Sequence, residues 1–482
     1  MPEELNRLFP SGIRGALGAV AVAGALAVVF RGFTVDDALV TARVAAHLAN
    51  GDGYRFNTSG PPVDAVTPLG WANLLAAFGA GTPLEMLARA RNLGLGAWLV
   101  AAGLLGALGP ARSRGRIALL ALVAGSVTLA AWSSAGMETG VVTLFTTLAL
   151  LEVAPAALAA GLAAAWRPEL LPWAVTLAAG ASVAAGTTAR ERMRGLAVRL
   201  PLAVVPALGV ALGRKAWFGA FAPLSVVAKA PELAHGVYYA ADALLGTGVA
   251  LFLLAPRALA ASDPRTRALT LAVFAHFVAI AAAGGDWMAL YRLVVPVLPT
   301  AILAAARLVP HMTVPWLAGR ALLFAIRPLF IAVAVAWPAR SVLANRLELI
   351  ERARPALRDG RSVACLDVGW VGAATNATLL DLAGITDPIV ARLPGGHTSK
   401  RVSNGLFENR AVDTVVLLLA PGAAPAARWQ DSSFARAVEE RVASLPALED
   451  FRIAAVLPLG GTTQRYLVAF RPVRAREAIP TR

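Results

Sequence analysis

Two adjacent carboxylates, Asp36 and Asp37, follow the first long apolar run of the chain, at the point where the backbone would leave a lipid bilayer. Charged side chains at the mouth of a membrane bundle are costly to place, so they usually have a partner or a task. A carboxylate at such a position can act as a general base on a hydroxyl group. Thr34 and Asp37 also have the spacing of a helix capping box, which would leave Asp36 as the freer carboxylate.

Further charged groups lie in later loops and could complete a reaction centre. They are Glu138, Arg167 with Glu169, Arg214 with Lys215, Lys229, and Asp286 with Arg292. A reaction that deprotonates a hydroxyl and expels a phosphate needs a carboxylate base and fixed cations that stabilise the leaving group. Each group also has a structural alternative. Glu138 would suit the N-terminus of the next helix. Arg167 and Glu169 could form an interfacial ion pair, and Lys229 could extend from a helix end.

The composition indicates a polytopic membrane protein. The chain has 482 residues, of which 57% are hydrophobic and 15% charged, and its mean hydropathy is +0.64. Many apolar stretches approach the length that spans a bilayer. The net charge of +15 comes almost wholly from Arg. These arginines do not cluster on a basic face, so we expect topogenic charge on cytoplasmic loops and no nucleic-acid partner.

Redox and metal chemistry have little support in the sequence. The single cysteine, Cys365, rules out an internal disulfide and a cysteine-based metal site. The histidines are scattered without metal-ligand spacing, so we predict no metal site. The acidic pair Asp36 and Asp37 could nevertheless hold a divalent cation.

The elements that position these groups follow from the charge of the loops. Three Arg-rich loops, at 112–116, 190–199 and 257–267, are assigned to the cytoplasm. This predicts about eleven spans, the first of them a retained helix rather than a cleaved signal. The predicted spans lie near 13–30, 93–109, 117–132, 140–153, 155–166, 170–186, 200–213, 236–256, 269–283, 293–308 and 321–337. The outer segment 31–92 carries the Asp pair, and Arg327 with Pro328 interrupts the last span.

The tail, residues 338–482, differs from the rest of the chain. Short apolar runs at 362–367, 412–419 and 466–470 alternate with polar stretches such as 433–445. This rhythm is typical of a small α/β domain. The predicted fold is therefore mostly α, with a helical transmembrane domain over 1–337 and an α/β domain over 338–482. Because the span number is odd, the tail is expected outside, above the charged groups.

The segment 34–71 resembles the first outer loop of a family of bacterial GT-C-type membrane glycosyltransferases. These are the terminal arabinofuranosyltransferases of the actinobacterial cell wall and their uncharacterised relatives. The loop motif is carried by Asp36, Asp37, Ala38, Arg43, Gly51, Gly53, Phe56, Asn57, Thr67 and Trp71. Later matches, in the family's order, are Gly136-Met-Glu138-Thr, Arg167-Pro-Glu169, Gly219 to Lys229, Gly284-Gly-Asp286-Trp-Met with Arg292, Asp367-x-Gly369, and Asp381-Leu-Ala-Gly384-Ile-Thr-Asp387.

The resemblance implies inverting transfer of an arabinofuranose-like sugar from a polyprenyl-phosphate donor to a glycan or glycoconjugate acceptor. It implies no required cofactor. It places the chain in the bacterial cytoplasmic membrane, with the active site and the tail on the extracytoplasmic side. The implied roles are general base for Asp36 or Asp37, with Asp36 favoured, phosphate binding for Lys229, Arg292 and Arg43, and substrate binding for Glu138, Arg167, Glu169 and Asp286.

The sequence also departs from the family pattern. Leu39, Val44 and Val66 stand where the family often has aromatic residues. The loss of sugar-contacting aromatic rings favours an alternative function, a non-catalytic membrane scaffold or an envelope or flagellar assembly factor of the same fold. The retained charged set favours the enzyme.

Overall fold

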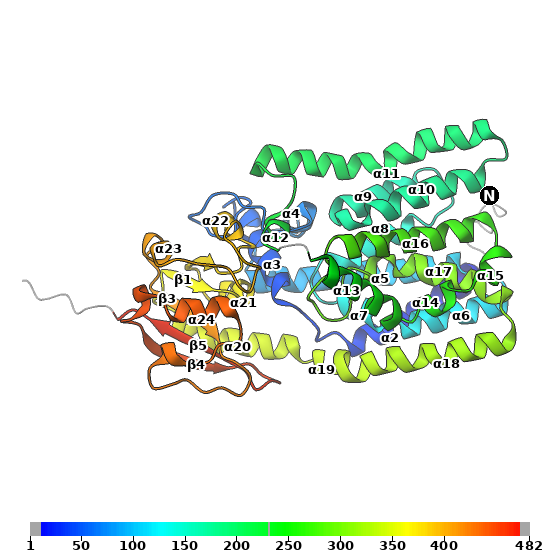
Figure 1. Ribbon diagram of the computed structural model, residues 1–482. Helices are drawn as coiled ribbons and strands as arrows, with labels where there is room; N and C mark the ends of the chain where they lie inside the picture. Colours follow the sequence, from blue (N-terminus) through cyan, green and yellow to red (C-terminus); the bar gives the residue numbers. More distant parts are fainter. Residues whose placement is uncertain (1–10, 230–231, 473–482) are drawn as a thin grey trace, which may run out of the picture.

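The helices of the protein run side by side along one long axis, and a small β-sheet closes one end of the molecule (Figure 1). The computed structural model describes residues 11–229 and 232–472, without the side chains of residues 327 and 328. The chain is thus a mostly α protein with a small C-terminal sheet.

Five described helices are long and apolar enough to cross a membrane, or six if one bent pair counts as a single span. The five are α2 (Gly12–Val29), α5 (Pro83–Leu108), α11 (Ala189–Phe218), α16 (Pro264–Ala282) and the long stretch Val314–Leu357. The bent pair, α6 (Ser113–Gly125) and α7 (Val127–Ser133), turns by 56°. These helices agree with a membrane protein, whereas the number of spans expected from the sequence is about eleven.

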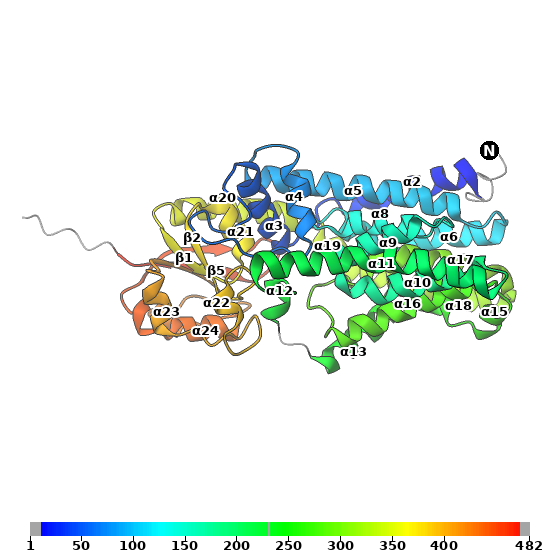
Figure 2. The ribbon, with the colours of Figure 1, turned by 90° about the horizontal axis from the view of Figure 1, so that it is seen from above.

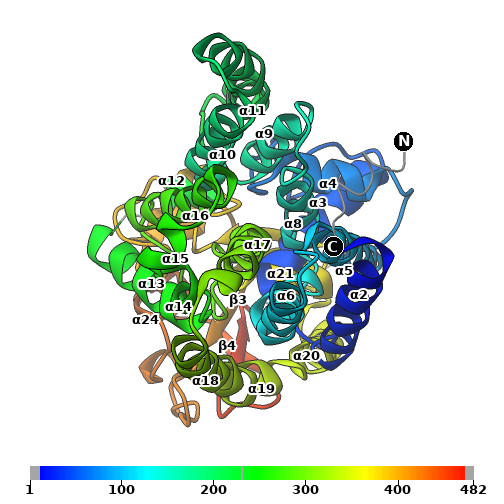
Figure 3. The ribbon, with the colours of Figure 1, turned by 90° about the vertical axis from the view of Figure 1, so that its right-hand side faces the viewer.

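The other expected spans correspond to shorter helices. They are α8 (Thr139–Leu148), α9 (Ala156–Trp166), α10 (Leu171–Ala185), α13 (Leu233–Gly246), α14 (Ala250–Leu253), α15 (Pro256–Ala260) and α17 (Leu298–Leu308), with 3-10 turns η1 (Pro168–Leu170), η2 (Val295–Val297) and η3 (Val309–His311). Helix α8 approaches α5 so closely that a Cβ on Gly140 would lie 2.2 Å from the carbonyl oxygen of Gly94. Of these helices, α8 and α17 lie near the centre of the bundle, while α11 and α18 lie at the periphery (Figure 3).

The outer segment 31–92 contains two short helices, α3 (Asp36–Ala49) and α4 (Leu69–Ala76). The capping box expected at the start of α3 is absent, because Val35 is the N-cap residue. The Thr34 hydroxyl instead donates to the carbonyl oxygen of Ala135, 2.8 Å away. The Asp pair therefore opens α3 directly.

The last apolar stretch runs almost unbroken into the tail. It consists of α18 (Val314–Ile331), a π-helical segment η4 (Ala332–Ala336), α19 (Trp337–Ala339) and α20 (Val342–Leu357). The interruption expected at Arg327 and Pro328 does not occur in the backbone, since α18 continues through both positions. The side chains of these two residues lie outside the described part of the chain.

The tail contains one five-stranded sheet in the order β2-β1-β3-β5-β4. Its strands are β1 (Ser362–Cys365), β2 (Thr378–Asp381), β3 (Thr414–Leu418), β4 (Arg452–Pro458) and β5 (Arg465–Phe470). Strand β1 pairs in parallel with β2 and β3, whereas β5 pairs antiparallel with β3 and β4. The helices around the sheet are α20, α21 (Val368–Ala374), α22 (Pro388–Ala391), α23 (Asn404–Asn409) and α24 (Ala437–Ala443), with η5 (Trp429–Asp431) and η6 (Pro446–Leu448).

The tail meets the helical part through α21, which packs against α3 and α20 (Figure 2). Helix α12 (Leu224–Val227) contacts α22 in the same region. This junction places the start of α3, where the Asp pair lies, directly beside the edge of the tail sheet.

Candidate active site

A cavity of about 430 Å³ lies at the junction between the helical part and the tail. Both parts of the chain contribute ionisable side chains to its lining. These are Asp36, Asp37, Glu138, Arg167, Arg292, Arg346, Asp367, His397 and Arg436. Negative and positive groups are thus nearly balanced, which suits a ligand that carries both hydroxyl groups and an anionic group.

Asp36 joins the two parts of the chain. Its Oδ2 and Oδ1 accept hydrogen bonds from the backbone N–H groups of Gly369 and Trp370, at 2.8 and 2.9 Å, at the start of α21. Arg346 Nη1 lies 4.0 Å from Oδ1. Burial raises the pKa of Asp36 above that of an ordinary carboxyl, and the charge of Arg346 opposes this rise. Asp36 therefore holds the tail in place, and proton transfer to it would disturb that junction.

Asp37 is the more open of the two carboxylates. Its side chain is 34% exposed, and its Oδ2 lies 3.7 Å from Arg292 Nη1. Arg292 is fixed by Asp286, whose Oδ2 lies 2.9 Å from Arg292 Nε, and its guanidinium lies over the ring of Trp132. The structure thus places a partly free carboxylate beside a rigidly held cation.

Lys229 belongs to the same electrostatic group. Although burial acts to raise the pKa of Asp286, the charges of Arg292 and Lys229 lower it. Two cations therefore act on one buried carboxylate, although only Arg292 is part of the cavity lining. Cations placed near one another in this way can together bind an anion.

Glu138, Arg167 and Glu169 form a buried ion triad. Arg167 Nη1 lies 2.7 Å from Glu138 Oε1, and Arg167 Nη2 lies 2.6 Å from Glu169 Oε1. The ion pair expected for Arg167 and Glu169 is present, while Glu169 itself does not line the cavity. The other oxygen of Glu138, Oε2, is buried without a hydrogen-bond partner among the described residues. A buried acceptor of this kind is costly unless a ligand or water satisfies it.

Arg43, assigned by resemblance to phosphate binding, is occupied elsewhere. Its buried guanidinium donates to the carbonyl oxygens of Phe56, Gly372, Thr375 and Ala377. Arg43 is not part of the cavity lining. Its guanidinium links the outer segment to the tail through these carbonyl groups, and this geometry gives no support to phosphate binding by Arg43.

The tail brings a second set of charges to the cavity. Asp367 Oδ2 accepts hydrogen bonds from Arg436 Nη2 and from the Tyr466 hydroxyl, both at 2.7 Å. Arg436 Nη2 also contacts Glu439, which is fully buried. Arg346, on α20, completes this side, and its Nε and Nη1 are buried without a hydrogen-bond partner among the described residues.

Sequence reasoning did not find Arg346, Arg436 or His397. Arg436 precedes Glu439 by three residues, a spacing that indicates a helix face rather than a site. The only sequence signal was Asp367, which belongs to the Asp-x-Gly motif. The packing of α21, in the tail, against α3 decides which tail residues reach the cavity. No local sequence pattern predicts that packing.

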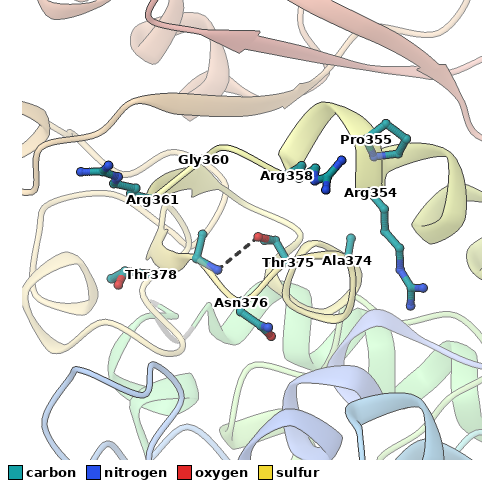
Figure 4. Close-up of a pocket in the computed structure, with 10 residues that line it drawn as sticks. Arg354, Pro355, Arg358, Gly360, Arg361, Ala374, Thr375, Asn376 and Thr378 are labelled. Carbon is teal, nitrogen blue, oxygen red and sulfur yellow. Dashed lines mark hydrogen bonds between the residues drawn. The ribbon is translucent and has the colours of Figure 1, made fainter. Parts of the chain in front are cut away.

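A larger, open hollow of about 720 Å³ lies on the outer side of the tail. It is lined by Arg354, Arg358 and Arg361 together with the segment 374–378. In Figure 4 these three arginine side chains point away from one another. Arg354 is also paired with Glu351, at 3.1 Å. Charged side chains from both parts of the chain meet in the junction cavity, whereas the arginines of this hollow point apart. We therefore take the junction cavity as the candidate site.

Within residues 11–229 and 232–472, no group of three or more His, Cys, Asp or Glu side chains is placed to hold a metal ion. Asp36 and Asp37 point to different partners, which are the start of α21 and Arg292.

Comparison with known proteins gives little functional information. The model of a family described as a domain of unknown function, DUF8728, matches residues 341–468. This range spans α20 and the tail sheet and excludes the helical part. No curated protein matches the chain.

Proposed function

We propose that the protein is a membrane glycosyltransferase that uses a polyprenyl-phosphate sugar as donor and a glycan or glycoconjugate as acceptor. The observation that carries the proposal is the placement of Asp37, a partly exposed carboxylate, 3.7 Å from the fixed cation Arg292 in a cavity between the bundle and the tail. A base beside an anion-binding group is the minimum that such a transfer needs.

In the proposed reaction, an acceptor hydroxyl oxygen attacks the anomeric carbon of the donor sugar. The hydroxyl proton moves to Asp37 as the new carbon–oxygen bond forms. The bond between the anomeric carbon and the phosphate oxygen breaks, and polyprenyl phosphate leaves with the bonding electrons. Attack from the side opposite the leaving group inverts the anomeric configuration, as the resemblance implies.

The leaving phosphate gains negative charge in the transition state, which Lys229 and Arg292 would stabilise. Asp286 would keep Arg292 in place, because it binds the guanidinium at 2.9 Å. The unpartnered Oε2 of Glu138 would accept a hydrogen bond from a sugar hydroxyl. Arg167 and Glu169 would act through Glu138 by fixing its carboxylate.

The resemblance to arabinofuranosyltransferases supplies the sugar class and the cellular location in this proposal. The chain would lie in the bacterial cytoplasmic membrane with the cavity on the extracytoplasmic face. The tail, which forms one wall of the cavity, would present the acceptor. A metal ion or other cofactor is not needed for this mechanism.

The first test compares Asp37→Asn with Asp36→Asn. Membranes containing each variant at wild-type protein level are given an isotope-labelled polyprenyl-phosphate arabinofuranose, and label in extracytoplasmic glycan is measured. We expect Asp37→Asn to lower transfer by about 100-fold or more, the range of a lost general base. Asp36→Asn should mainly reduce the yield of folded protein, because Asp36 contacts α21. Undiminished transfer in Asp37→Asn would refute the proposal.

One observation favours the alternative of a non-catalytic scaffold. Asp36 and Arg43, two residues of the loop motif, both bind the tail backbone. A motif could therefore be retained to hold the tail rather than to react. Under this alternative, Asp37→Asn would leave the cellular phenotype unchanged, whereas Asp36→Asn and Arg43→Met would abolish it.

A further inference from the structure

The tail contributes a loop to the candidate site that no motif singled out. Residues 394–400 connect α22 to the following segment, and their tip carries His397 and Thr398, which both line the cavity. Asp37, on the helical side, lines the same cavity, and the charges of Asp37 and Lys229 both act on the His397 ring. The loop therefore brings a tail side chain close to the charged groups of the helical part.

The base of this loop is rigid. The side chain of Lys400 is fully buried, and its ammonium group donates to the carbonyl oxygens of Ala391 and Leu393 at 2.8 and 3.0 Å. Arg441 donates to the carbonyl oxygen of Lys400 at 3.1 Å. The backbone N–H of Val438 donates to the carbonyl oxygen of Thr398 at 3.1 Å. A buried Lys is an unusual anchor, so the position of the loop tip is tightly determined.

The imidazole of His397 has no such partners. It is half-buried, and within the described residues neither ring nitrogen has a hydrogen bond. Burial and the charges of Lys229 and Lys400 lower the pKa of the imidazole, while Asp37 and Asp286 oppose this effect. In its neutral form this imidazole would offer a ligand one hydrogen-bond donor and one acceptor.

We propose that His397 is a third phosphate-contacting residue, supplied by the tail, which donates a hydrogen bond to the anion held by Lys229 and Arg292. The inference rests on the proposed function, which places the donor phosphate at these two cations. His397 and Arg292 line the same cavity, and the charges of Asp37 and Asp286 act on both, so an anion bound at Arg292 lies near the imidazole. A phosphate would also replace the repulsion by Lys229 with attraction, so its binding would favour the protonated ring.

The test follows the five histidines of the full chain in lipid nanodiscs by NMR. The ring signal of His397 is assigned with His397→Ala, and His311, exposed at the far end of α17, serves as the internal control. The probes are undecaprenyl phosphate and inorganic phosphate, added separately between pH 5 and 8. We expect undecaprenyl phosphate to raise the titration midpoint of His397 by about one pH unit, equivalent to tenfold coupling, and to leave His311 unchanged.

Affinity measurements complete the test. His397→Ala should weaken binding of undecaprenyl phosphate by about tenfold, the loss of one hydrogen bond to a charged group. His397→Gln, which keeps an N–H donor, should bind with intermediate affinity and lose the pH dependence. An equal midpoint shift with inorganic phosphate would assign the site to free phosphate rather than to the lipid headgroup.

The outcomes separate the two proposals. If undecaprenyl phosphate binds and Lys229→Ala weakens it, while His397→Ala binds as wild type and the midpoint is unmoved, the inference about His397 is wrong and the proposed function stands. If undecaprenyl phosphate binds to neither the wild type nor any variant, the phosphate-binding part of the proposed function fails as well.

Discussion

Neighbouring residues of the outer loop have different tasks, since some hold the tail in place and others face the candidate site. Asp36 and Asp37 are neighbours in sequence and begin the same helix, yet one binds the tail backbone and the other faces Arg292. Successive residues of a helix point about 100° apart, so the two carboxylates face different partners here. The adjacent carboxylates in the sequence could predict a functional position. The sequence could not predict which member binds the tail backbone, because that depends on where α21 lies.

Arg43 offers a test at the scale of one residue. Replacing it with Met removes a guanidinium that satisfies four backbone carbonyl groups of the outer segment and the tail. We expect Arg43→Met to destabilise the folded protein by about 3 kcal/mol, since buried polar groups lose their partners. Thermal unfolding of the purified protein in nanodiscs measures the change.

The control for this variant is Arg89→Met. Arg89 also donates to two backbone carbonyl groups, those of Gly79 and Ala80, but these contacts are exposed. Its loss should change stability by less than 1 kcal/mol. Equal losses of stability in the two variants would show that the buried hydrogen bonds of Arg43 do not stabilise the contact between the outer segment and the tail.

At the scale of elements, the apolar pattern located most helices but not all of their ends: the helix expected near 200–213 is α11, Ala189–Phe218. The span expected at 13–30 is α2, Gly12–Val29, and the run expected at 412–419 contains β3, Thr414–Leu418. The stretch expected near 155–166 is α9, Ala156–Trp166, whereas the stretch expected near 140–153 ends earlier, as α8, Thr139–Leu148. Buried helices and bilayer spans are both apolar, so composition alone does not separate them. Strands β2 and β4 were missed because they are short or largely exposed.

The loop at 394–400 gives a prediction at the scale of an element. Gly395 has φ of +101°, and a Cβ there would lie 2.4 Å from the carbonyl oxygen of Ser399. Gly395→Ala should therefore displace the loop tip and weaken binding of undecaprenyl phosphate about as much as His397→Ala. Gly396→Ala is the matched control, since the nearest atom to its Cβ, the Ser399 hydroxyl, is 3.6 Å away. If both glycine variants bind the lipid like the wild type, the loop does not position a ligand contact.

At the scale of the whole molecule, the candidate site exists only where the two parts of the chain meet. Helix α21 approaches α3 so closely that a Cβ on Gly369 would lie 2.1 Å from the carbonyl oxygen of Asp36. Gly369→Ala should therefore separate the tail from the bundle, increase protease cleavage in the tail, and reduce transfer by at least tenfold. Limited proteolysis of the full chain in nanodiscs, run beside the transfer assay, measures both effects.

Gly405→Ala is the control for this prediction. Gly405 lies in α23 of the same tail, and a Cβ there would meet no atom within 4 Å. It should behave as the wild type or slightly more stably, because alanine favours a helix. A Gly369→Ala protein with normal protease resistance and normal transfer would show that the junction accommodates the added methyl group, and would contradict this prediction.

The hydrogen bond between Asp36 and Gly369 joins residues that are 333 positions apart. During synthesis from the N-terminus, the Asp pair is made early, and its tail partners follow after all the candidate spans. Asp367 further needs Tyr466, on strand β5, to complete its contacts. A nascent chain would thus pass through a stage in which its helices are inserted but its reaction centre is unassembled. Under the proposed function, the order of synthesis would delay sugar transfer until the tail has folded, since a truncated polypeptide would lack the tail side of the cavity.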